Sequence, residues 1–221
     1  MSVHEPGVID CDIHPSVPGL KALLPYMDPV WQEAFVLRGI DGLDMQSYPP
    51  GAPITCRPDW REAGIKPGTD LGAMQRQSLD PLNTRAAICN VLYGGQVAVS
   101  ETMGAAICSA INDWLVEHWL DQDSRLRASI VVPAQAPLLA AEEIERRAGD
   151  RRFVQVLMPV ACEMMLGRST IGQSGKPPHG TICRSACTPA ACIVTHQPRA
   201  AGRRIFCTTT WRSLRPSRIS C

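Results

Sequence analysis

Acidic residues are missing from the last quarter of this chain. All 21 Asp and Glu residues lie at or before Glu163, whereas the segment from Met164 to Cys221 carries nine Lys or Arg. The first 163 residues therefore have a net charge of about −8 and the remainder +9, although the whole chain is close to neutral. This absence excludes carboxylate chemistry from the end of the chain. It also indicates that two different kinds of sequence meet near Gly167.

Long apolar runs are also missing. No segment approaches the roughly 20 apolar residues of a membrane span. A secretory signal requires an apolar region after its first residues, and none follows the polar segment Met1 to Gly7. We therefore expect a cytoplasmic protein with no membrane partner. In that compartment the ten cysteines are mostly thiols, not a disulfide framework.

The first three quarters of the chain, by contrast, have the periodicity of a folded domain. A first strand is expected at residues 7–14, followed by a Pro- and Gly-rich excursion over 16–80 with one helix at Pro29 to Leu37. Further strands are expected near 86–92, 127–132 and 153–158, and helices near 103–120 and 137–148. Alternating strands and helices predict an α/β protein with a parallel sheet. Four strands are half of a TIM (β/α)8 barrel, and a doubly wound open sheet is the alternative.

The candidate site is Asp12-x-His14, at the end of the first expected strand. The two side chains point to the same side of the strand, about 6–7 Å apart along it. A carboxylate oxygen and an imidazole nitrogen can then reach one divalent metal. The competing interpretation is that an Asp and a His before Pro15 only satisfy backbone groups at a turn. Asp10, on the same side, is interpreted as a structural carboxylate behind these two residues.

The segment Val8-Ile-Asp-Cys-Asp-Ile-His-Pro15 resembles the first strand of the amidohydrolase-related (amidohydrolase 2) family. Four later segments are similar to one branch of that family, namely Ile111 to Leu115, Trp119 to Arg127, Ser129 to Pro133 and Arg152 to Pro159. The resemblance covers roughly residues 6–168. It implies a metal-dependent TIM-barrel hydrolase or non-oxidative decarboxylase for a small carboxylic-acid, amide or lactone substrate, and an intact parent that can form homo-oligomers. Asp12 and His14 then take the metal positions, with zinc as the default ion and manganese as the alternative.

The departures from the family are as informative as the match. Family members supply a His after strand five, a His after strand six and an Asp after strand eight, and none has a counterpart here. His179 and His196 have no strand pattern around them, and no Asp or Glu follows Glu163. The catalytic residue is therefore unassigned. A metal with two protein ligands is held weakly compared with the usual three or four, so we expect doubtful metal binding and little activity from this chain.

A shifted reading frame is our hypothesis for the change of composition. In the shifted frame, each codon consists of the last base of one residue's present codon and the first two bases of the next residue's codon. The bases that now encode Lys176-Pro177 then encode Ala or Thr. The shifted frame then permits Ala-Arg-His-Asp-Leu-Pro-Val-Gly-Met-His-Ala-Gly through Ala190, similar to the family's fifth strand with its metal-ligand His. We therefore expect two regions, a half barrel at residues 1–168 and an irregular, disordered, frameshift-derived tail at 169–221.

Three other interpretations of this tail are weaker. Cys183, Cys187 and Cys192 with His179 or His196 could bind zinc, although their spacing fits no paired CxxC pattern. A set of arginines could form a nucleic-acid arm, which would make the chain a non-catalytic binding protein; these are Arg199, Arg203, Arg204, Arg212, Arg215 and Arg218. Few aromatics accompany that charge, so nucleic acid is not the expected partner. An unselected terminus is the third interpretation.

Overall fold

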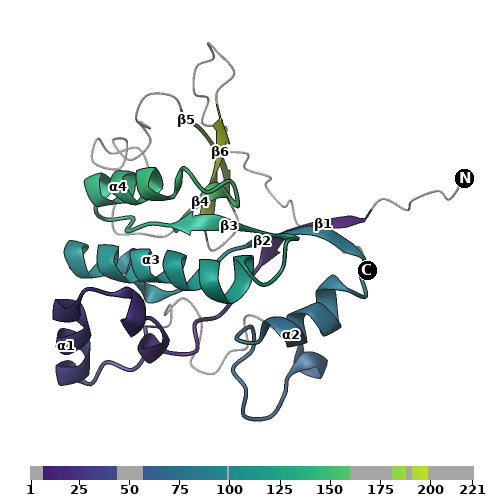
Figure 1. The fold of residues 1–221 in the computed structure, drawn as a ribbon, viewed down its shortest axis with the longest axis horizontal. Coiled ribbons are helices and arrows are strands. Elements are labelled where there is room, and N and C mark those ends of the chain that lie inside the picture. Colours follow the sequence, from purple (N-terminus) through teal and green to yellow (C-terminus); the bar gives the residue numbers. More distant parts are fainter. Residues whose placement is uncertain (1–6, 44–56, 99, 160–180, 188–190, 199–221) are drawn as a thin grey trace, which may run out of the picture.

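Four parallel strands form a curled half-barrel in the computed structural model, which describes residues 7–43, 57–98, 100–159, 181–187 and 191–198 (Figure 1). The strands are β1 (Val8–Ile13), β2 (Thr84–Cys89), β3 (Leu126–Val131) and β4 (Phe153–Pro159). β1 pairs with β2, β2 with β3 and β3 with β4, each time in parallel. Each expected strand is confirmed to within a few residues of its predicted bounds.

The strand order distinguishes the two fold classes left open by the sequence. The four parallel strands follow one another in the sheet as they do in the sequence. A doubly wound sheet instead reverses its strand order at a switch point, and no reversal occurs among these four strands. The arrangement is that of the first half of a barrel.

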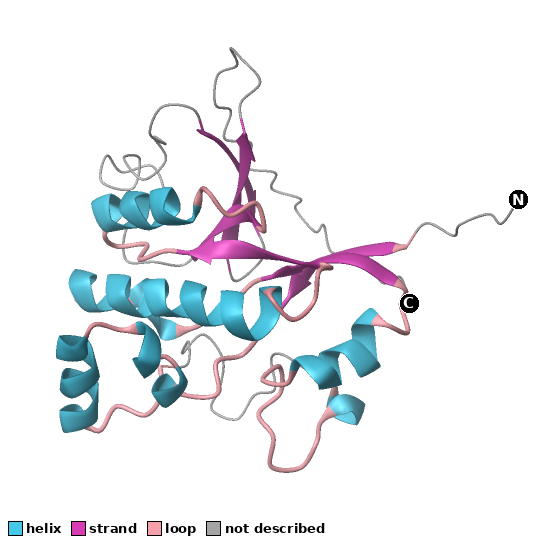
Figure 2. Cartoon of the chain, in the orientation of Figure 1, coloured by secondary structure: helices cyan, strands magenta, loops and turns pink. Residues whose placement is uncertain are grey.

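Two helices cover one side of the strands (Figure 2). They are α3 (Glu101–Leu115), which continues into a π-helical turn at Val116–Leu120, and α4 (Pro137–Arg147). α3 begins at Ser100, whose hydroxyl accepts a bond from the Met103 amide. Both helices contact each other and β3, which buries the apolar face of each one. The first was expected from its three- and four-residue apolar spacing, and the second from Pro137 at its first position, the strong helix formers after it and the end at Gly149.

A buried polar cluster joins α3, α4 and β3. The Asn112 side chain accepts a bond from the Val131 amide and donates to the Val131 carbonyl, both at 2.9 Å. It also donates to the Glu143 carboxylate at 2.6 Å. Arg146 lies against the same carboxylate at 2.8 Å. Asn112 belongs to one of the segments that resemble the amidohydrolase-related family, and its contacts give it a structural role.

The excursion between β1 and β2 carries short helices. α1 (Pro29–Arg38) matches the helix expected there, and Asp28 caps its first turn by accepting from the Val30 amide at 2.9 Å. Gly39 ends it in the left-handed conformation at φ 61°. α2 (Leu71–Met74) and a π-helical turn at Gln75–Leu79 follow before β2. This second part lies near the carboxyl end of β1, where it forms one wall of the site described below.

The sheet continues into residues for which the sequence predicts irregular structure. β5 (Thr181–Cys187) and β6 (Ala191–Pro198) form an antiparallel pair, and β6 also pairs antiparallel with β4. The expectation of an irregular chain is therefore wrong for these two segments. Without β6, this edge of β4 would present unpaired backbone groups, and the run Ile193-Val-Thr195 has the β-branched residues that suit a strand. The rest of 169–221, including the six arginines, lies outside the described residues.

β1 forms the opposite edge of the sheet. Within the described residues it pairs with β2 alone, and Val8 and Ile9 are about half exposed. Among the helices that the structure describes, none is long and apolar enough to cross a membrane.

Candidate metal centre

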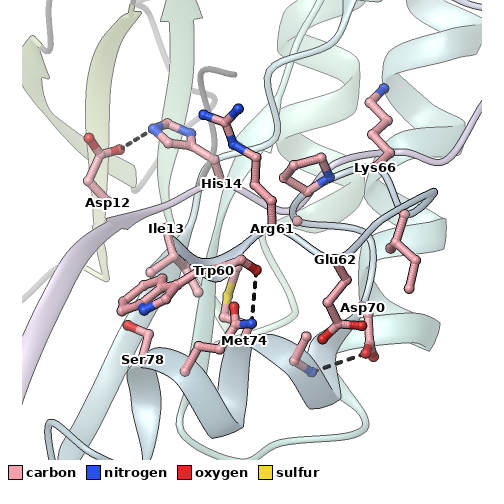
Figure 3. A pocket seen from close by; sticks show the side chains of 15 residues that line it. Asp12, Ile13, His14, Trp60, Arg61, Glu62, Lys66, Asp70, Met74 and Ser78 are labelled. Atoms are coloured by element: carbon pink, nitrogen blue, oxygen red, sulfur yellow. Dashed lines mark hydrogen bonds and ion pairs between the residues drawn. The ribbon is translucent and has the colours of Figure 1, made fainter. Parts of the chain in front are cut away.

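The structure places Asp12 and His14 together at the carboxyl end of β1, as the sequence predicts. Asp12 is near the end of the strand and His14 follows its last residue, Ile13. The Nε2 atom of His14 lies 3.4 Å from Oδ1 of Asp12, and the two side chains face each other at one end of a cavity (Figure 3). The Asp12 side chain is about half exposed, whereas that of His14 is mostly covered.

The other nitrogen of His14 is occupied by the protein. Nδ1 lies 2.9 Å from the backbone carbonyl oxygen of Asn90. A carbonyl can only accept, so Nδ1 carries the proton and donates it there. This bond determines the tautomer and leaves Nε2, which faces Asp12, as the nitrogen that can bind a metal.

Asp12 and His14 also perturb each other's protonation. The hydrogen bond with His14, helped by one from Asn90, lowers the pKa of the Asp12 carboxyl, although partial burial opposes it. Burial acts to lower the pKa of the His14 imidazole. The bonds to Asp12 and to the Asn90 carbonyl outweigh burial, so the pKa of His14 is raised. The raised pKa widens the pH range over which His14 is an imidazolium, in which both ring nitrogens donate.

The spacing of Asp12 and His14 suits a tetrahedral ion. Two ligands bound to zinc at about 2.0–2.1 Å in tetrahedral geometry lie about 3.3 Å apart. The observed separation of Nε2 and Oδ1 is 3.4 Å, so an ion can contact both atoms with little movement of either side chain. The residues fit zinc in donor type and spacing, but no cluster of three His, Cys, Asp or Glu in the described part of the chain could hold a metal.

Asp10 acts on the backbone. Its Oδ1 atom accepts a hydrogen bond from the Asp12 amide at 3.1 Å. This contact agrees with the structural role expected for Asp10, because the carboxylate holds the strand backbone next to the ligand position.

A cavity of about 190 Å³ opens beside Asp12 and His14. Its other wall comes from the excursion, with apolar surface from Trp60 and Met74 and a cationic side chain from Arg61 (Figure 3). Arg61 is exposed and forms no ion pair with any described residue. The wall is held by a bond from the Gln77 side chain to the Trp60 carbonyl at 3.0 Å.

Lys66 and two carboxylates line the same cavity but have partners. The Lys66 ammonium donates to the Val17 carbonyl at 3.1 Å. Asp70 caps α2 by accepting from two backbone amides, and Glu62 lies 3.8 Å from Arg76. These contacts leave Arg61 as the cavity's available cation within the described residues.

Sequence reasoning missed three buried polar side chains next to the site, namely Asn90, Ser129 and Gln155. Asn90 Nδ2 donates to Asp12 Oδ1 at 2.7 Å. Ser129 Oγ donates to Asn90 Oδ1, and Gln155 Nε2 donates to Ser129 Oγ at 2.8 Å. The hydrogen bonds therefore run from β4 through β3 and Asn90 to β1. The available signal was that each of these polar residues stands between two apolar neighbours in its strand segment.

The backbone of β5 and β6 argues against the alternative zinc site. Cys183 pairs with His196, and Cys187 pairs with Cys192. Cys183 and Cys187 are four residues apart on one strand, which is about 13 Å at the rise of an extended chain. One ion cannot contact both pairs. His179 lies outside the described residues.

Within the described part of the chain, the thiols agree with the expectation of free cysteines. Cys11, Cys89 and Cys108 form no disulfide. Burial raises the pKa of the Cys108 thiol, with help from Glu143. A thiol of this kind is inert, so it is not a candidate nucleophile.

Comparison with known proteins finds one family match for this chain. A sequence model of the amidohydrolase family matches residues 9–166, whereas no curated protein matches the chain. The matched region contains all four parallel strands and the Asp12–His14 pair. The chain belongs to the amidohydrolase family.

Proposed function

We propose that Asp12 and His14 are the first-strand metal ligands of a metal-dependent hydrolase site, with zinc as the preferred ion. The observation that carries this proposal is the contact between His14 Nε2 and Asp12 Oδ1, with Nδ1 already bonded to the Asn90 carbonyl. A bound divalent ion would supply an activated water or a polarised carbonyl. Asp12 and His14 would hold the ion, and the bond from Nδ1 to the Asn90 carbonyl keeps His14 Nε2 facing Asp12.

The substrate proposed for this site is a small molecule with one anionic group and an apolar body. The cavity volume of about 190 Å³ suits a small ligand. Trp60 and Met74 offer apolar surface to the apolar part of the substrate, and Arg61 can form a bidentate pair of hydrogen bonds with a carboxylate. Hydrolysis of an amide or lactone and non-oxidative decarboxylation are both compatible with such a substrate.

The activity of this 221-residue chain is proposed to be low. The described residues supply two donors for a metal, whereas catalytic zinc sites normally use three protein ligands. No Asp or Glu follows Glu163, so the family's late catalytic carboxylate has no equivalent. Loss of one essential member of a catalytic unit removes most of the acceleration.

Metal binding is the direct test. Zinc content by elemental analysis and zinc affinity by competition with a chromophoric chelator should fall in Asp12→Ala and in His14→Ala. Asp59→Asn is the matched control, because Asp59 is an exposed carboxylate paired with Arg57 outside the cavity. Equal zinc binding by all four proteins would show that the ion, if bound, is held elsewhere.

The activity test compares this chain with a version whose reading frame is restored after Gly167. Both are assayed on a panel of aromatic and lactone-like acids, for hydrolysis and for release of carbon dioxide. We expect turnover from the restored protein and little from this chain. Equal turnover, with stoichiometric metal in the short chain, would overturn the proposal of low activity and the frameshift hypothesis.

A further inference from the structure

Asn90 contacts both proposed metal ligands through different atoms. Its backbone carbonyl oxygen accepts a hydrogen bond from His14 Nδ1 at 2.9 Å. Its side-chain Nδ2 donates to Asp12 Oδ1 at 2.7 Å and to the Cys11 carbonyl at 3.3 Å. One residue following β2 therefore determines the orientation of two side chains that come from β1.

The Asn90 side chain is itself held in one orientation. Its Oδ1 atom accepts bonds from the Ser129 hydroxyl and from Gln155 Nε2, which is 3.4 Å away. Rotation of the amide by half a turn would place the NH2 group against two donors and the carbonyl oxygen against the Asp12 carboxylate. Such a rotation would lose the hydrogen bonds on both sides, so Nδ2 must point at Asp12.

Burial makes this arrangement stiff. Asn90, Ser129 and Gln155 are all under 5% exposed, and water cannot replace a lost partner at such depth without a cavity. An unpaired amide there is costly. Asp12 and His14 are more exposed than these three residues. The stiff part of the cluster is therefore away from the cavity, and the two ligands are the part that solvent can reach.

We propose that Asn90, held by Ser129 and Gln155, is a positioning residue that fixes Asp12 Oδ1 at the spacing from His14 Nε2 that a tetrahedral ion needs. The inference rests on the proposed metal function of Asp12 and His14. Asn90 acts through Asp12, because its side chain contacts Asp12 and its contact with His14 uses the backbone. Replacing the Asn90 side chain therefore releases Asp12 and leaves His14 in place.

The main test is a double-mutant cycle on zinc affinity in the full 221-residue chain. Asn90→Leu keeps the number and branching of the side-chain heavy atoms and removes the amide. We expect it to weaken zinc binding about 10- to 100-fold, the range seen when partners of metal ligands are removed. In an Asp12→Ala background the same substitution should change zinc affinity little, because the side chain through which Asn90 acts is gone.

A second variant and a second readout guard against simple loss of folding. Ser129→Ala leaves Asn90 in place and removes one of its two donors, so it should weaken zinc binding less than Asn90→Leu does, and again only when Asp12 is present. Circular dichroism checks the fold of each variant. Cobalt(II) absorption reports coordination geometry, and we expect the spectrum of cobalt bound to Asn90→Leu to differ from that of cobalt bound to the parent chain.

The outcomes separate the inference from the function on which it rests. Zinc binding by the parent chain that depends on Asp12 but not on Asn90 or Ser129 would overturn the positioning role and leave the metal site standing. Equal losses from Asn90→Leu with and without Asp12 would show a merely structural role, and would also overturn it. Absence of Asp12-dependent zinc binding in the parent chain would overturn both.

Discussion

β1 and β3 belong to the same sheet but differ in their position in it and in their burial. β3 lies between β2 and β4, and Ser129, Ile130 and Val131 are at most 1% exposed. β1 lies at the edge, where Ile9 is 51% exposed. The proposed chemistry is on β1, whereas most of the packing is on β3. The site therefore lies on the less supported strand, and neighbouring residues determine its geometry.

Asn90 and Ser129 connect β1 to β3. The Asn90 amide links Asp12 to the Ser129 hydroxyl, so the edge strand is tied to the centre of the sheet by polar side chains. A site built this way keeps its ligands accessible to substrate while their geometry is determined by buried groups.

The largest loss of stability is expected from a substitution at the centre of the sheet. Ile130→Ala should lower the free energy of unfolding by about 3 kcal/mol, because it empties a fully buried position. Ile9→Ala on β1 is the matched control and should cost less than about 1 kcal/mol, since half of that side chain is already in water. Urea denaturation measures both. Similar losses for the two variants would show that β1 is as well packed as β3.

An intermediate loss of stability is expected from a substitution of Asp123, just before β3 begins. Hydrogen bonds from Arg125, helped by one from Gln75 and opposed by partial burial, lower the pKa of Asp123 to about 2 from the usual 3.8. Because the folded pKa is lower than the unfolded one, the carboxylate stabilises the fold above about pH 4, and this contribution is lost as the pH falls toward 2.

Asp123→Asn tests this contribution. It should cost about 2 kcal/mol at pH 7, the equivalent of the shift in pKa, and should flatten the dependence of stability on pH between about 4 and 2. Thermal unfolding across that range measures it. Asp80→Asn is the control, because Asp80 pairs with the same arginine but is exposed, and it should change stability by less than about 1 kcal/mol. An unchanged acid profile in Asp123→Asn would contradict the assignment.

The smallest effect on stability is expected at the site itself. Asp12→Asn keeps an oxygen that can accept from Asn90, and the Asp12 side chain is 46% exposed, so the free energy of unfolding should change by about 0.5 kcal/mol or less. Zinc affinity should nevertheless fall, because an amide oxygen is a poorer zinc ligand than a carboxylate. A large loss of stability would indicate that Asp12 serves the fold instead of a metal.

Much of the fold could be predicted from the sequence because its signals are local. Apolar spacing identified α3, and Pro137 with the strong helix formers before Gly149 identified α4. Short apolar runs closed by Pro133 and Pro159 identified β3 and β4. Backbone periodicity and capping depend on residues a few positions apart. The hairpin of β5 and β6 was missed because its pairing with β4 depends on an open edge that no local pattern reports.

For the site, the sequence by itself determined that Asp12 and His14 share one side of a strand end, because side chains alternate along a strand. Only the tertiary structure decided that the Asn90 carbonyl, 76 residues away, holds His14, and that the residues around Arg61 close a cavity over the pair. These contacts join distant parts of the chain, and they exist because parallel strands bring their carboxyl ends to one edge of the sheet.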